Sequence, residues 1–401
     1  MKRETAQNAE HILGKLISFP TVSGRPNSDI IAYIEDYLTP HGVGILLDPH
    51  EDGERINLFA TIGGTGSADD NGANSVGGII LSGHTDVVPA SDKGWGGNPF
   101  EMRVADGRLY GRGAVDMKGF LAMALAMVPA FKAAENELSM PLHLAFTFDE
   151  EVGCFGAEQM PAFLAKYNIK PAMAVIGEPT GMQPFIGHKG GMELTTIVRG
   201  SSGHASKPDG KVNAIYYAAK MIEMINQIAS EKAANPDPSS PFDPPYTSLS
   251  IGQIDGGEGR NIIPDECRFE WEIRPLPGDD PHATLGAVRD YAAQVLIPEM
   301  QAIDPEADIE FILISDVPAM EARPDSVAAQ LIARLWTNER PDVVSFGTDG
   351  AYFQQAGMET VVFGPGGMAQ MHQPDEYIEQ AAIDEGIAFL TRLLSHMCSP
   401  S

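Results

Sequence analysis

The chain has 401 residues, and its 27 Lys and Arg against 55 Asp and Glu give a formal net charge of −28. Hydrophobic residues make up 43% of it, the usual share for packed globular proteins, so extensive disorder is excluded and the length suggests about two or three domains. Such a negative charge repels phosphate backbones and anionic lipids, which argues against nucleic acids and membrane surfaces as partners.

The sequence shows no pattern expected of an export signal or a membrane span. Glu4 and Glu10 fall where a signal peptide needs its apolar core. The most apolar stretch, GFLAMALAMVPAF at 119–131, is about 13 residues long, whereas a membrane span needs about 20, so it predicts a buried helix. We therefore expect a cytoplasmic protein.

The cysteines agree with that location. They are Cys154, Cys267 and Cys398. Because they are isolated and odd in number, they offer neither a disulfide framework nor a CxxC metal site, and they suit a reducing compartment.

The first part of the chain alternates helices with buried strands. Helices are expected near 6–17 and 28–41, followed by strands at 57–62 and 78–82. The runs GGIILSG, LHLAFTF and AMAVIGE lack polar alternation, which is typical of strands covered on both faces. An α/β domain is predicted, with a mixed, mostly parallel sheet flanked by helices.

Around residue 188 the pattern changes to alternating strands, separated by helices near 212–232 and 283–301. The strands are expected at 192–198, 247–254, 268–273 and 309–314. Their order, βαββαβ, indicates a small α+β layer.

After about residue 318 the first pattern returns, with strands at 343–346 and 360–363 and a closing helix at 383–396. The simplest account is an α+β domain, 188–315, inserted into a discontinuous domain formed by 1–187 and 316–401.

Ionisable residues follow several of the buried strands. They are His84 and Asp86 after the first run, Glu150 and Glu151 after the second, and Glu178 after the third. Open α/β sheets bind ligands beyond the carboxyl ends of their strands, so these side chains are expected to converge. Each cluster alone is also compatible with a surface turn. Asp116, which comes before the apolar helix, is also compatible with a carboxylate that caps that helix.

Asp116 in GRGAVDMKG and His372 in MHQPDEY complete a set of imidazoles and carboxylates. Such a set suits a pair of divalent cations, with zinc favoured and cobalt or manganese as alternatives. Because the set holds no thiolate, a catalytic centre is favoured over a structural one. The HxD spacing suggests that Asp86 orients His84.

Five motifs, SGHTDVVP, GRGAVDMKG, DEEVG, GEPT and HQPDEY, occur in a specific order and spacing. In this the chain resembles, over essentially its whole length, the co-catalytic zinc aminoacylase and metallopeptidase superfamily. The resemblance implies two zinc ions per subunit, for which cobalt can substitute. One ion would be held by His84 and Glu178, the other by Glu151 and His372, and both by Asp116.

The same resemblance implies catalytic roles. Glu150 resembles the general base, and Asp86 the acid that orients the first histidine. The peptide that follows the bridging aspartate is cis in this superfamily, so we predict a cis bond between Asp116 and Met117.

The inserted domain resembles the lid of the superfamily, which also makes the dimer contact, so a homodimer is expected. His204 in SSGHAS matches a histidine that reaches the reacting carbonyl, often from the partner subunit. Asn261 and Arg274 match substrate-binding positions, and Gly364 and Gly366 are predicted to let the backbone approach the substrate. Ordinary turn or surface positions are the alternative for each residue.

Within the superfamily, GRGAVDMKGF, WEIRPLPG and GPGGMAQMHQPDEY look most like acetylornithine deacetylases. The expected activity is zinc-dependent hydrolysis of an N-acyl amino acid, foremost N-acetylornithine to ornithine and acetate in arginine biosynthesis. Thr348-Asp349-Gly350 stands where Thr-Glu-Ala is expected, so a succinyl-diaminopimelate desuccinylase or a related aminoacylase or carboxypeptidase is the alternative. A non-catalytic, metal-dependent binding protein is a further alternative. The intact Glu150 argues against it.

Overall fold

The structure is a computed structural model that describes residues 2–63, 75–91, 93–337 and 339–399. The chain forms two compact units. Unit 1 comprises Met1–Gly187, Ala322–Asp342 and Thr348–Ser401, and unit 2 comprises His188–Glu321 and Val343–Gly347. Unit 2 extends past residue 315 because its last long strand continues to Val317.

An eight-stranded sheet forms the centre of unit 1. Its order is β1 (Gly44–Pro49), β2 (Ile56–Ile62), β6 (Leu142–Thr147), β3 (Ile79–His84), β7 (Met173–Ile176), β16 (Glu359–Val362), β8 (Phe185–His188) and β15 (Asp342–Val344). The four strands β6, β3, β7 and β16 are parallel, whereas β1, β2 and β8 pair antiparallel with their neighbours. Every residue of β3 and β6 is buried, which explains their unbroken apolar runs. The predicted mixed α/β sheet is confirmed.

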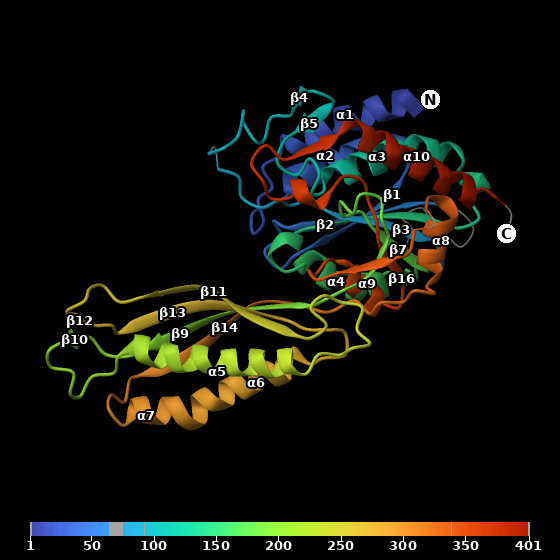
Figure 1. Ribbon diagram of the computed structural model, residues 1–401. Helices are drawn as coiled ribbons and strands as arrows, with labels where there is room; N and C mark the ends of the chain where they lie inside the picture. Colours follow the sequence, from blue (N-terminus) through green and yellow to red (C-terminus); the bar gives the residue numbers. More distant parts are fainter. Residues whose placement is uncertain (1, 64–74, 92, 338, 400–401) are drawn as a thin grey trace. The chain divides into compact units, whose positions relative to one another are not determined.

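Helices cover both faces of this sheet (Figure 1). Helices α1 (Lys2–Ile17), α3 (Lys118–Ala133) and α10 (Gln380–Met397) pack together on one face, and α4 (Phe155–Lys166) and α9 (Gly350–Gln355) pack together on the other. Helix α2 (Ser28–Leu38) contacts β2, and α8 (Val327–Leu335) contacts β7 and β16.

Helix α3 is the apolar segment that the sequence analysis interpreted as a buried helix. Residues 118–128 are all buried, which confirms that interpretation. Of the helices in the described ranges, none is both long enough and apolar enough to cross a membrane.

A small three-stranded sheet, in the order β17 (Tyr377–Glu379), β5 (Arg108–Tyr110) and β4 (Arg103–Ala105), was not predicted. Tyr377 pairs with Tyr110 in it. The pairing brings the segment just before Asp116 beside the segment just after His372.

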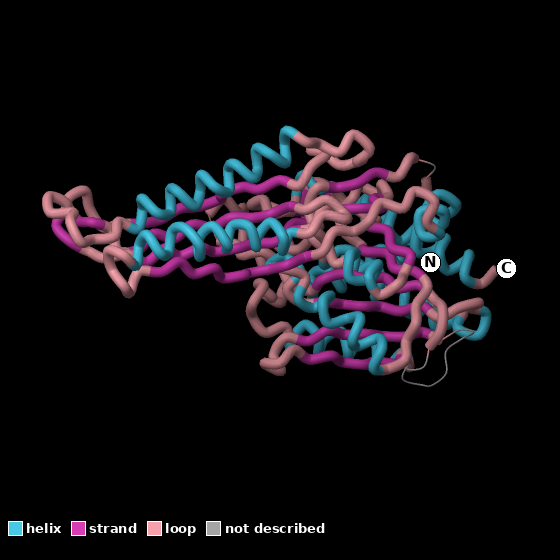
Figure 2. The backbone as a smooth tube through the Cα atoms, turned by 90° about the horizontal axis from the view of Figure 1, so that it is seen from below, coloured by secondary structure: helices cyan, strands magenta, loops and turns pink. Residues whose placement is uncertain are grey.

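Unit 2 is an antiparallel four-stranded sheet with helices along one face (Figures 1 and 2). The sheet order is β11 (Ser248–Gly256), β13 (Glu266–Arg274), β9 (Gly191–Arg199) and β14 (Asp308–Val317), and the helices are α5 (Ala214–Ala234), α6 (Pro281–Tyr291) and α7 (Ile297–Gln301). Alternate residues of β13, including Phe269 and Trp271, are buried in the core that these helices cover. The order along the chain confirms the predicted βαββαβ layer.

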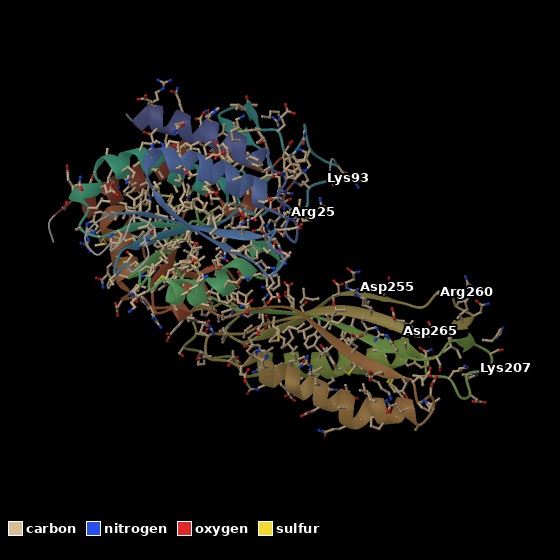
Figure 3. All side chains as sticks on the ribbon, turned by 180° about the vertical axis from the view of Figure 1, so that it is seen from behind. Arg25, Lys93, Lys207, Asp255, Arg260 and Asp265 are labelled. Atoms are coloured by element: carbon tan, nitrogen blue, oxygen red, sulfur yellow. The ribbon has the colours of Figure 1, made fainter. Side chains whose placement is uncertain are left out.

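A short pair of strands, β10 (Gly203–His204) and β12 (Ile262–Ile263), extends one end of unit 2. Strand β10 comes after β9 along the chain, and β12 comes before β13. Because β9 and β13 pair antiparallel, the short pair lies at the end of the sheet where β9 ends and β13 begins. Figure 3 shows Lys207 and Arg260 at this end of the unit.

Candidate metal centre

Most of the predicted site residues in unit 1 lie where parallel strands end. His84 is the last residue of β3, and Glu178 lies two residues after β7 ends at Ile176. Glu150 and Glu151 begin a 3-10 turn that follows β6. Because β3, β6 and β7 are parallel neighbours, their carboxyl ends meet at one edge of the sheet.

Asp116 and His372 reach this edge from loops. Asp116 lies just before α3, and its peptide bond to Met117 is cis, which confirms that prediction. His372 adopts a left-handed φ of 60° in the connection between β16 and β17. A non-glycine residue at positive φ is uncommon and is found preferentially at functional sites.

Asp116 lies between the two histidines. Its Oδ1 is 3.2 Å from His84 Nε2, and its Oδ2 is 3.1 Å from His372 Nε2. Glu151 Oε2 is 2.9 Å from His372 Nε2, and Glu178 Oε1 is 3.9 Å from His84 Nε2. Two groups of potential ligands therefore share Asp116, each with its ligand atoms within 4.8 Å of one another: His84–Asp116–Glu178 and Asp116–Glu151–His372.

The chemistry of these residues fits a pair of metal ions. Glu151 Oε1 and Glu178 Oε1 are buried, and neither has a hydrogen-bond partner within the described part of the chain. Buried polar atoms are normally paired, so these two oxygens call for a ligand. One divalent cation in each group would satisfy them, and imidazole with carboxylate is a donor set that suits zinc or a similar ion.

The electrostatics agree with that fit. Burial, together with repulsion from Glu178, raises the pKa of Glu150 well above its ordinary value. Burial also raises the pKa of Glu178 well above its usual range. Hydrogen bonds to Asp116 and Glu151 raise the pKa of His372 to about 10. These carboxylates outnumber the cationic groups, and bound divalent cations would offset the surplus negative charge.

Comparison with known proteins gives a consistent result over the whole chain. The model of peptidase family M20/M25/M40 matches residues 80–396. The chain belongs to this family. The acetylornithine deacetylase of Myxococcus xanthus is 33% identical over 392 residues, 96% of both chains. That of Proteus mirabilis is 33% identical over 393 residues, 96% of this chain and 95% of the other. The family match and these deacetylase relatives together show that the protein is a metal-dependent amidohydrolase.

Several solved structures share the fold of this chain. Human carnosine dipeptidase 1 has a TM-score of 0.72 at 18% identity, covering 99% of this chain and 100% of its own. An M20 metallo-carboxypeptidase of Sulfolobus solfataricus has a TM-score of 0.74 at 17% identity, covering 97% of this chain and 99% of its own. A dinuclear metal binding peptidase of Bacillus subtilis has a TM-score of 0.63 at 16% identity, covering 98% of each chain.

In this M20 protein, Asp86 contacts both His84 and the turn that carries Glu150. The carbonyl oxygen of Asp86 lies 3.0 Å from His84 Nδ1, while its carboxylate Oδ1 is 3.6 Å away. The carboxylate instead accepts hydrogen bonds from the backbone N–H groups of Glu150 and Glu151, at 3.1 and 3.3 Å, and from the Ser23 hydroxyl at 2.7 Å. Asp86 therefore orients His84 through its main chain and anchors the turn through its side chain.

Two further charged residues lie beside the centre: Asp149, the first residue of the DEEVG motif, and Lys118, which was not singled out from the sequence. Asp149, at a left-handed φ of 53°, accepts hydrogen bonds from the Gly24 N–H at 2.7 Å and from Arg55 Nη1 at 2.5 Å. Lys118 Nζ donates to two carbonyl oxygens around the end of α1, at 3.0 and 2.8 Å. The sequence signal for such residues is a charged side chain next to an apolar run, because a charge buried there requires a partner.

Gly364 and Gly366 bring the backbone after β16 close to the loop that carries Glu178. A Cβ at Gly364 would lie 2.4 Å from the Gly177 carbonyl oxygen and 2.6 Å from that of Glu178. Gly366 has a φ of 88°, and its carbonyl accepts a hydrogen bond from the Gly181 N–H at 2.6 Å. Gly364 is thus required for close packing against the segment that carries Glu178, and the contact of both glycines with a substrate stays a prediction.

The remaining predicted residues belong to unit 2. His204 and Asn261 lie together at its β10–β12 end, where the Ala205 N–H donates to the Asn261 carbonyl at 3.0 Å. Arg274 is the last residue of β13, at the opposite end of that strand, and its guanidinium binds Glu272 Oε2 at 2.9 and 2.6 Å. Unit 2 brings the first two residues together and separates them from Arg274, and the roles of all three stay predictions.

Proposed function

We propose that the protein is a zinc-dependent hydrolase of N-acyl amino acids, which converts N-acetylornithine to ornithine and acetate in cytoplasmic arginine biosynthesis. The observation that carries this proposal is the 33% identity to the acetylornithine deacetylase of Myxococcus xanthus over 96% of both chains. The pair of ligand groups that share Asp116 supports a dinuclear centre.

His84, Asp116 and Glu178 would hold one zinc ion, and Asp116, Glu151 and His372 the other, with cobalt as a substitute. When bound, the two ions would lower the pKa of a water molecule and polarise the acyl carbonyl. Asp86 keeps His84 Nδ1 engaged, which leaves Nε2 facing the centre.

Glu150 is the proposed general base. Its Oε2 lies 4.0 Å from His84 Nε2, next to both ligand groups, and backbone hydrogen bonds to Asp86 fix the turn that carries it. Glu150 would take a proton from the attacking water and pass it to the nitrogen of the leaving amine as the C–N bond breaks. The products are acetate and a free α-amino acid.

Three residues of unit 2 are proposed to contact the substrate, in addition to Gly364 and Gly366 of unit 1. Arg274 is proposed to bind the α-carboxylate in a charge-assisted contact, with Asn261 as a further substrate ligand, and His204 to stabilise the developing oxyanion. Strand β13 has nine residues, which at about 3.3 Å each span roughly 27 Å between Arg274 and the end where His204 lies. One small substrate cannot span that distance, which supports a role for His204 in the active site of the partner subunit.

A homodimer formed through unit 2 is part of this proposal. Strands β11 and β14 form the edges of its sheet. Three consecutive residues of β14, Ile312, Leu313 and Ile314, are 37%, 44% and 44% exposed. An exposed apolar edge strand favours pairing with another chain, which supports β14 as a contact between subunits.

A desuccinylase or peptidase is the second candidate, because Asp349 stands where the deacetylase pattern has a glutamate. The Asp349 carboxylate is buried, and one of its oxygens lies within 4.8 Å of a carboxylate oxygen of Glu150. This difference in side-chain length near the general base is the feature that favours another acyl group or amino acid.

The test is a comparison of kcat/KM for N-acetylornithine, N-succinyl-diaminopimelate and a dipeptide, with zinc or cobalt supplied and zinc content measured by mass spectrometry. We expect two zinc ions per chain and at least a ten-fold preference, about 1.4 kcal/mol, for N-acetylornithine. A higher kcat/KM for either other substrate overturns the substrate assignment, and an active protein that holds one ion overturns the dinuclear centre.

A further inference from the structure

A third group of potential metal ligands lies beside the proposed centre. It consists of Glu150, Cys154 and Asp349, whose ligand atoms lie within 4.8 Å of one another, and it has no residue in common with the other two groups. Cys154 Sγ is 3.7 Å from Glu150 Oε1. Cys154 and Asp349 are 2% and 1% exposed, so a ligand held here would be shielded from water.

The fold holds the three side chains in place before any ion binds. Cys154 follows the 3-10 turn of Glu150, and its N–H donates to the Glu150 carbonyl at 3.0 Å. Asp349 precedes α9, and the Thr147 hydroxyl at the end of β6 donates to its Oδ2 at 2.7 Å. A site built on the ends of regular elements is more rigid than one built on a free loop.

One atom of this group lacks a partner. Oδ1 of Asp349 is buried without a hydrogen-bond partner among the residues that the structure describes. An unpaired buried carboxylate oxygen is costly, and the nearby Glu150 carboxylate adds repulsion between like charges. A cation placed between the two carboxylates and the thiol would remove both costs.

We propose that Glu150, Cys154 and Asp349 form an inhibitory site for a soft divalent cation, namely cadmium, or zinc in excess of the two ions of the centre. Cysteine makes this group different, because thiolate ligands select soft metal ions and the other two groups contain only imidazole and carboxylate. Binding forms a sulfur–metal bond and releases the thiol proton of Cys154 to solvent. The inhibitory effect rests on the proposed function, since the ion would engage the carboxylate of the general base.

The test titrates the zinc-loaded protein with cadmium chloride and follows the ultraviolet charge-transfer band of cadmium bound to thiolate. Cadmium that displaces zinc from the main centre gives no such band, because those ligands lack sulfur. We expect a band that saturates at one cadmium ion per chain while both zinc ions remain bound.

Matched variants assign the band to Cys154. The free cysteines Cys267 and Cys398 serve as controls, and their replacement by serine should leave the band intact. Cys154→Ser should abolish it, and Asp349→Asn, which keeps an oxygen but loses the charge, should weaken cadmium binding about ten-fold. No band in the wild-type protein, or a band that survives Cys154→Ser, overturns the site, and the Asp349 variant still decides the matter if Cys154→Ser does not fold.

Activity provides the second readout. Hydrolysis by the wild-type protein should fall along the same cadmium curve as the band rises, whereas Asp349→Asn should need at least a ten-fold higher concentration for the same loss. A band without loss of hydrolysis refutes the inhibitory effect. Failure of the zinc-loaded protein to hydrolyse acyl amino acids before cadmium is added refutes the proposed function and leaves the binding result standing.

Discussion

The carboxylate of Glu376 accepts a hydrogen bond from the backbone N–H of Asp116 at 3.2 Å, and the same oxygen accepts one from Val115 at 3.0 Å. Its other oxygen lies 2.6 Å from Arg112 Nη1, and both side chains of that ion pair are buried. Glu376 lies just after His372, so these contacts join the segments that carry two of the proposed ligands of one ion.

Replacing Glu376 by Gln should weaken the binding of metal at this centre. The amide keeps the shape of the side chain, but it loses the charge that pairs with Arg112 and the geometry that fixes Asp116. Loss of a residue that orients a ligand typically costs 10-fold to 100-fold in metal affinity. The measurement is the zinc dissociation constant, obtained by competition with a chromophoric chelator.

Glu379→Gln is the matched control, because Glu379 lies three residues further on and its side chain is 56% exposed. It should leave zinc affinity unchanged. A Glu376→Gln protein with reduced stability but wild-type zinc affinity would show that the buried pair serves the fold and not the metal centre.

Glu150→Gln should abolish most of the hydrolysis while leaving zinc content at the wild-type value. The substitution preserves the shape of the side chain and removes its basicity, and general-base catalysis contributes about 10²-fold to 10⁴-fold. Turnover and zinc content are measured on the same preparation. Glu158→Gln, an exposed change in the first turn of α4, is the control, and near-normal turnover in the Glu150 variant refutes the assigned role.

Several buried strands of unit 1 could be predicted because both of their faces are covered, which leaves an uninterrupted apolar run. Strands β3 and β6 are of this kind, and His84 and Glu150 lie at or just beyond their ends, so the positions of these residues in the fold followed from the pattern. Strands β1 and β4 were missed because both are only partly buried, and β4 has only three residues, so neither gives a strong apolar signal.

Contacts between distant segments could not be predicted in the same way. Arg112 and Glu376 are 264 positions apart, and only the complete fold brings them together. The carbonyl oxygen of Asp86 faces His84, and its carboxylate binds the turn that carries Glu150. This arrangement depends on backbone angles that residue types do not determine. Sequence patterns indicated which residues gather at the site, and tertiary structure determines how each one is oriented.

A hybrid of two inactive variants tests whether His204 acts across the dimer. His204→Gln and Glu150→Gln subunits, co-expressed with different tags, should form dimers in which one active site is free of both changes. Each hybrid dimer has one intact site out of two, so purified hybrids should show about half of the wild-type activity. Activity is measured on dimers purified through both tags, beside doubly tagged dimers of each single variant. No recovery in purified hybrids argues that His204 acts within its own subunit.

The stability of unit 1 should depend on pH through His143, a residue of β6 that lies away from the metal ligands. Its Nδ1 lies 3.0 Å from Thr61 Oγ1, and its ring lies 5.1 Å from that of Phe59. Burial lowers the pKa of His143 to about 4. In the unfolded chain a histidine has a pKa of about 6.5.

The folded state therefore keeps His143 neutral while the unfolded state takes up a proton, so this contribution is fully present above about pH 6.5 and is lost as the pH falls toward about 4. The loss amounts to about 3 kcal/mol in the free energy of unfolding over that window. Urea unfolding midpoints, measured with chelator present so that metal binding does not contribute, should fall less steeply with acid in His143→Gln than in wild type. The exposed His11→Gln serves as control and should follow the wild-type curve. If wild type and His143→Gln lose stability in parallel below about pH 6.5, the histidine is already protonated in the folded protein and its burial is offset by other groups.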